Sequence, residues 1–123
     1  MVIEPESEGA AVWAGIQFAQ EYTINGLKFT EGVQNKKGGW VTETPRIEVL
    51  IDGAWVAVEA AVSPDYVTEQ NENGFWQYRF TFDEVTCEGI RIVGKAGGTD
   101  PYISVGELIP RTNGVSVITE FNG

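Results

Sequence analysis

The sequence predicts an all-β fold, a jelly-roll β-sandwich of two antiparallel sheets. Many short segments alternate apolar and polar residues, as strands with one buried face do. Turn signals separate these segments, and the chain contains 15 glycines, which suit tight turns. No stretch of about ten or more residues carries the apolar stripe of a helix. Roughly seven or eight short strands at this spacing are typical of a two-sheet sandwich.

The clearest element is a β-hairpin at Arg46–Glu59. Ile47, Val49 and Ile51 are apolar at alternate positions, and Asp52-Gly53 follows as a two-residue turn. Asp-Gly favours a type I′ turn because this turn needs positive φ at both central residues. One face of the hairpin needs a cover, so we expect the rest of the chain to be organised around it.

The remaining strands are expected on both sides of this hairpin. In the segment before it, Asn25-Gly26 is either a turn or a β-bulge. The chain length of 123 residues indicates a single domain, 1–123. Within it we expect a loosely held arm at 1–12 and a tail or last strand at 111–123. The other expected strands lie within 13–30, 77–82, 89–94 and 102–108, separated by loops at 32–45, 63–76 and 95–101.

The charge balance argues against nucleic acid and anionic membranes as partners. The chain has 8 basic and 18 acidic residues, no histidine and a formal net charge of −10. Its basic pair, Lys36-Lys37, is too small a cluster to engage a phosphate backbone. No apolar run approaches the length of a membrane span, and residues 1–6 lack the features of a signal peptide.

Catalytic chemistry has little support in the sequence. Without histidine, Ser-His and Cys-His arrangements are excluded, and Cys87 is the single cysteine. We expect Cys87 to be a buried, inert thiol. A carboxylate pair of the glycosidase type stays open in principle, but surface charge is the better reading of the acidic residues. Zinc lacks its usual ligands, whereas calcium accepts the oxygen ligands that acidic loops provide.

The aromatic residues divide into two groups. Those at strand positions are expected in the core: Phe29, Trp55, Tyr78, Phe80 and Phe82. The loop aromatics Trp40, Tyr66, Trp76 and Tyr102 could each stack on a sugar ring or plug an end of the sandwich. Trp40 is the best candidate for stacking, because the small and polar residues beside it give it little local cover.

Several segments together resemble a known family. The strings FTEG, GGW, PRIEVLIDGAWVAV and SPDY are followed by YRFTF, CEGIRIVGKAGG and YISVGEL. This pattern, over Ala14 to Pro110, is similar to the discoidin, or coagulation-factor type C, domain. The bacterial members grouped with the family 32 carbohydrate-binding modules are the nearest part of that family. CEGIRIVGKAGG and YISVGEL are the most specific segments.

The resemblance implies a galactose-binding-like jelly roll that holds its ligand in loops at one end. Those loops map onto residues 32–41, 66–75 and 97–102. Bacterial relatives are accessory domains of secreted glycan-degrading enzymes or adhesins, and they often carry a structural calcium ion. The resemblance puts Glu107 forward as a calcium ligand. This chain departs from the family in lacking the N-terminal Asp-Gly loop and the histidine of galactose sites.

The sequence-based hypothesis is therefore a non-catalytic, extracellular carbohydrate-binding module of a larger bacterial protein. Its partner would be a polysaccharide or a glycoprotein glycan. Trp40 and Tyr102 would stack on sugar, Asn35 and Asp100 would bond its hydroxyls, and Tyr66 and Trp76 would add contacts. The alternative is an interaction or spacer domain, which would expose an apolar patch or an unpaired strand edge instead of a sugar site.

Overall fold

The computed structural model describes residues 2–7, 9–35, 37–69, 76–113 and 115–116, and these residues form an all-β, antiparallel fold. These described residues make eight strands. They are β1 (Val2–Ile3), β2 (Val12–Glu31), β3 (Arg46–Ile51), β4 (Ala54–Val58), β5 (Ala61–Ser63), β6 (Gln77–Gly94), β7 (Ile103–Thr112) and β8 (Val115–Ser116). Among the described residues, no helix has the length and apolar character needed to cross a bilayer.

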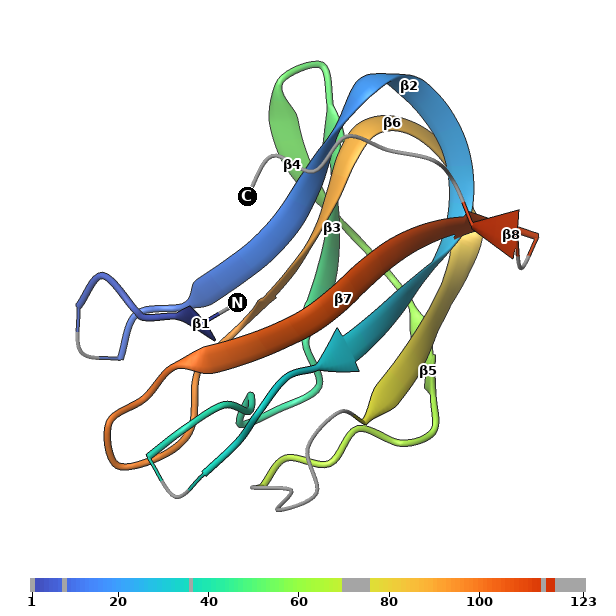
Figure 1. The fold of residues 1–123 in the computed structure, drawn as a ribbon. Coiled ribbons are helices and arrows are strands. Elements are labelled where there is room, and N and C mark those ends of the chain that lie inside the picture. The colour runs from blue at the N-terminus through green and yellow to red at the C-terminus, as the bar shows by residue number, and fades with distance from the viewer. Residues whose placement is uncertain (1, 8, 36, 70–75, 114, 117–123) are drawn as a thin grey trace.

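Two long strands form the middle of the sheet. The strand order is β1-β7-β2-β6-β3-β4, with β5 also paired to β6 and β8 to β7. β2 has 20 residues and β6 has 18, and Figure 1 shows both arching together, so that the sheet curls over itself. The pairing of β2 with β6 shifts register between Gln17 and Tyr22 and again between Ile24 and Gly26. Such bulges bend a strand and increase its twist.

The strands differ from the sequence prediction in two ways: β2 and β6 are longer than expected, and they occupy the centre of the sheet, where the hairpin was expected. The prediction of short, separate strands was wrong for β2 and β6, and Asn25-Gly26 lies at a bulge within β2. The hairpin prediction is confirmed: β3 pairs with β4, and Asp52 and Gly53 have φ values of 49° and 78°. However, this hairpin lies at an edge of the sheet, so β2 and β6 organise the fold.

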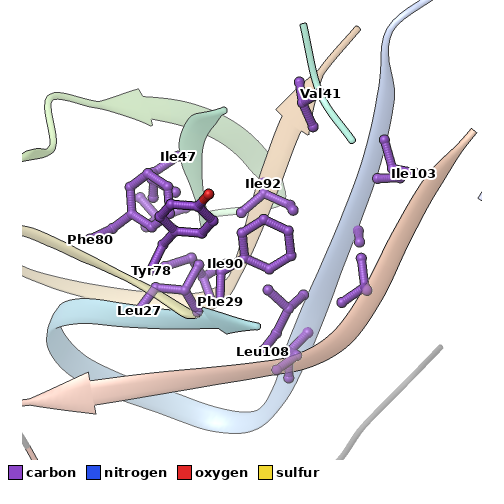
Figure 2. Close-up of a cluster of buried hydrophobic side chains, with 14 of the residues drawn as sticks. Leu27, Phe29, Val41, Ile47, Tyr78, Phe80, Ile90, Ile92, Ile103 and Leu108 are labelled. Atoms are coloured by element: carbon purple, nitrogen blue, oxygen red, sulfur yellow. The ribbon is translucent and has the colours of Figure 1, made fainter. Parts of the chain in front are cut away.

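A single hydrophobic cluster lies inside the curl. Figure 2 shows Phe29 of β2 with Tyr78, Phe80, Ile90 and Ile92 of β6 in this cluster. Each of these five side chains is no more than 1 % exposed. Because β2 and β6 contribute from both sides of their bends, the two halves of the sheet share one core.

Three of the predictions about buried residues have different outcomes. Cys87 is buried and free, as predicted, and burial raises the pKa of its thiol. Trp55 was expected in the core, but it lies half-buried on the outer face of the sheet, opposite Leu50. Phe82 packs only partly against the core cluster.

Candidate functional site

Two loops at one end of the curled sheet interlock through backbone hydrogen bonds. We call residues 37–42 and 95–104 together the end-loop ladder. The Gly39 amide donates to the Tyr102 carbonyl at 2.9 Å, and the Gly97 amide donates to the Trp40 carbonyl at 3.0 Å. The Asp100 amide donates to the Lys37 carbonyl, also at 2.9 Å. These bonds hold the two loops as one rigid surface, although they are 53 or more residues apart.

Alternation along the ladder turns Trp40 and Tyr102 outward. Gly39 is bridged to Ile103, and Ile103 and Val41 are buried in the core, so the residues next to them point to the other side. Both aromatic rings are half-buried. The structure thus places the two predicted stacking residues on the outward side of one loop pair.

Each ring lies on a glycine of the neighbouring loop. A Cβ atom built at Gly38 would come within 2.6 Å of Cδ1 of Tyr102, and one built at Gly97 would collide with the indole of Trp40. Any larger residue at either position would displace a ring. The two glycines therefore fix how far each ring stands out from the surface.

The two predicted polar contact residues, Asn35 and Asp100, lie in the segments that carry these rings, and the Asn35 side chain has a structural role. Asn35 and Asp100 are both exposed. The Asn35 side-chain oxygen accepts the Lys37 amide at 2.8 Å, which closes a tight turn between Asn35 and Gly38. The Asp100 carboxylate projects from the ladder while its own amide is bonded to Lys37.

The other two predicted contact residues pack against Tyr78. Tyr66 is 8 % exposed, and its ring packs on Tyr78 with centroids 4.8 Å apart, so it plugs the end of the core. Trp76 is 39 % exposed and lies beside Tyr78, with ring centroids 6.4 Å apart. The intervening residues 70–75 of the predicted loop 66–75 lie outside the described residues.

A buried carboxylate beneath the ladder was missed by the sequence interpretation. Glu31, at the end of β2, is only 2 % exposed. Its Oε2 accepts the Tyr66 hydroxyl at 2.9 Å, and that hydroxyl accepts the Val41 amide at 3.1 Å. Burial raises the pKa of Glu31 to about 7, although Tyr66, Gln34 and Tyr78 lower it in part. In the sequence, the only sign of this burial was that the acid occupies an inward-facing position of a strand with alternating apolar residues.

Glu107, the expected calcium ligand, is engaged by a cation. It lies on β7, and its Oε1 is 3.3 Å from Nζ of Lys28 on the adjacent strand. No group of three or more His, Cys, Asp or Glu side chains suited to a metal occurs in the part of the chain that the structure describes. Among the described residues, Glu107 is thus paired with Lys28 and does not belong to a cluster of acidic side chains.

The end-loop ladder, together with Asn35 just before it, exposes groups that can contact a ligand. It offers two ring faces, a carboxylate and an amide on a rigid backbone, and these groups can stack on and hydrogen-bond a polar ring. Of four hollows on the described surface, one touches the ladder at Lys95, and none of the four is lined by Trp40 or Tyr102.

Comparison of this chain with family models, with curated proteins and with solved structures finds no match.

Proposed function

We propose that this protein is a non-catalytic carbohydrate-binding module that contacts a glycan through its end-loop ladder. The observation that carries this proposal is the outward placement of Trp40 and Tyr102 on two interlocked loops, each ring supported by a glycine. Trp40 and Tyr102 would stack on sugar rings, while Asn35 and Asp100 would bond hydroxyl groups. Because the backbone is already ordered, little conformational entropy would be lost on binding.

The discoidin-like resemblance of the sequence supports the same proposal. It would make the curled sheet a galactose-binding-like jelly-roll sandwich and the protein an extracellular part of a larger enzyme or adhesin. Open sites of this kind bind in the micromolar to millimolar range, roughly −8 to −4 kcal/mol. Tethering to a partner domain would then raise the effective affinity.

Glycan-array screening followed by isothermal titration tests the proposal. We expect a glycan that binds the native protein to lose about tenfold or more in affinity with Trp40→Ala and with Tyr102→Ala. Val33→Ser is the matched control, because Val33 is an exposed apolar residue of the same chain segment (61 % exposed) outside the ladder. Circular dichroism of each variant separates lost binding from lost folding.

Equal affinity of the native protein and both ladder variants for such a glycan would contradict this placement of the site. An absence of binding to every plant, host and microbial glycan at millimolar concentration would contradict the function itself.

A second candidate function, an interaction domain, is favoured by the edge of the sheet. β4 is the last strand in the order, and Val56 on it is 44 % exposed. Such an edge can accept a strand from another chain. Light scattering over a concentration series tests this candidate, since edge pairing between copies predicts a mass that rises with concentration.

A further inference from the structure

The outer face of the sheet carries a second aromatic surface, formed by residues outside the end-loop ladder. Register aligns Gly15, Arg91, Glu48 and Ala57 in one row across β2, β6, β3 and β4. Trp13 and Trp55 each lie two residues from this row and so project from the same face. Their ring centroids are 6.2 Å apart, at 44°.

Arg91 packs against both indoles. Its guanidinium carbon lies 4.3 Å from the ring centroid of Trp55 and 5.1 Å from that of Trp13. Glu48 holds the guanidinium, with its Oε1 at 2.8 Å from Nε and 2.6 Å from Nη2 of Arg91. A Cβ atom at Gly15 would come within 2.7 Å of the Arg91 Cβ, so this glycine leaves room for the arginine stem. We call Trp13, Trp55 and Arg91 the indole plate.

The core does not need this plate. Neither tryptophan belongs to the buried cluster, and Trp13 is 50 % exposed. The side chains of Arg91 and Glu48 are only 18 % and 13 % exposed, so the support beneath the rings is fixed. An exposed aromatic surface is a candidate for interaction, and a surface whose side chains are already held in place loses less entropy when a ligand binds.

The charges around the plate indicate the chemistry of its ligand. On one side, Arg46 and Arg91 outnumber Glu48 and leave one positive charge. On the other side, Trp13 borders a hollow of about 320 Å³ that is also lined by Glu4 and Glu6. The carboxylates would repel an anionic ligand, and the arginines would repel a cationic ligand. A neutral polyhydroxylated ring can use both, because its hydroxyls donate to carboxylates and accept from guanidinium groups.

From this arrangement we propose that the indole plate is a binding surface for a neutral saccharide chain, with one ring stacked on Trp13 and hydroxyls directed to Glu4 and Glu6. This proposal stands on its own residues and does not need the end-loop ladder to bind. Two sugar-binding surfaces on one module would let it hold two strands of a polysaccharide, or two branches of one glycan, at the same time.

Indole N–H signals in ¹⁵N-resolved NMR test the proposal directly. The chain has 4 tryptophans, so replacing each by phenylalanine assigns each signal. The probes are three neutral hexasaccharides, cellohexaose, xylohexaose and mannohexaose, with hexagalacturonate as the anionic comparison. We expect at least one neutral probe to shift the Trp13 and Trp55 signals, and Trp13→Ala to weaken that binding about tenfold. Val33→Ser is the control, since Val33 is an exposed apolar residue (61 % exposed) that belongs neither to the indole plate nor to the edge strand β4.

The possible outcomes separate this proposal from the one made for the ladder. Shifts at Trp40 without shifts at Trp13 and Trp55 would overturn the indole plate as a site and leave the ladder standing, and the reverse result would support the plate alone. Shifts of the plate signals by hexagalacturonate only would overturn the neutral ligand. No shift with any probe at about 10 mM, or concentration-dependent broadening at Trp13 without saccharide, would overturn the proposal in favour of no ligand or of a second copy of the chain.

Discussion

Glu31 carries a proton in the folded protein at pH values where an exposed glutamate has lost it. Burial raises the pKa of Glu31 from 4.5 to about 7, so the folded state holds this proton more tightly than the unfolded chain does. The free energy of unfolding should therefore be highest below about pH 4.5 and fall as the pH rises to about 7. Above about pH 7 the effect of Glu31 on the free energy of unfolding no longer changes with pH, and it destabilises the folded state.

Glu31→Gln should remove this pH dependence. The amide keeps an oxygen that can accept the Tyr66 hydroxyl but cannot ionise, so the variant should gain about 3 kcal/mol relative to the native protein between pH 4.5 and pH 8. Urea unfolding at both pH values measures the change. Glu59→Gln, at an exposed position, is the control and should shift both values equally. The same pH profile for the native protein and Glu31→Gln would contradict this reading.

Cys87 gives a second prediction at the scale of a residue. It is 0 % exposed, and burial raises the pKa of its thiol, so both access and the thiolate fraction are low. Iodoacetamide at pH 8 should leave the folded protein unlabelled and should label it fully in denaturant. Mass spectrometry of the intact protein measures the result, and rapid labelling under native conditions would show that the strand opens locally.

Among the elements, the end-loop ladder depends on glycines in a way that the hairpin turn does not. Gly98 has a φ of 108°, and a Cβ there would collide with the Lys37 carbonyl and lie 2.7 Å from the Gly38 Cα. Gly53 has a φ of 78° but nothing within 4 Å of its Cβ position. Gly98→Ala should therefore cost about 3 kcal/mol or more of stability, and Gly53→Ala only about 1 kcal/mol from backbone strain.

Thermal unfolding of the two alanine variants compares these costs. Gly98→Ala should also weaken glycan binding, because it displaces the loop that carries Tyr102, whereas Gly53→Ala should bind as the native protein does. Equal losses of stability in the two variants would mean that the ladder loops adjust freely.

The sequence predicted where turns and strands occur better than it predicted how long each strand is or which of its faces is buried. The Asp52-Gly53 turn was readable because its chemistry is local. The long β2 was not, because the apolar alternation breaks where the register shifts between Gln17 and Tyr22, and a bulge then looks like a loop. Trp55 was misplaced because both faces of the hairpin are apolar, and only tertiary packing decides which face is inside.

For the candidate site, the sequence identified the two ladder rings but not the features that hold them. Trp40 and Tyr102 stood out as loop aromatics among small and polar residues. Their support by Gly38 and Gly97 depends on two loops that meet only in the folded chain. Glu31 looked like an ordinary acid at a strand end, because burial cannot be read from a single residue type.

For the whole molecule, the shared core predicts cooperative unfolding. One cluster contains residues from both halves of β2 and of β6, so neither half of the sheet keeps a complete core without the other. Far-ultraviolet circular dichroism and tryptophan fluorescence should therefore report the same transition midpoint in urea. Two separate midpoints would show that the halves unfold independently.

The continuity of β2 and β6 also limits how this chain can be cut and rejoined. A break within Val12–Glu31 or Gln77–Gly94 would leave fragments that each lack part of the shared core, so neither fragment should be soluble when expressed alone. New chain ends, or an inserted reporter peptide, belong at Asp52-Gly53, where the turn is exposed and nothing crowds it. A circular permutant that opens there would keep both long strands whole and leave the ladder and the indole plate free.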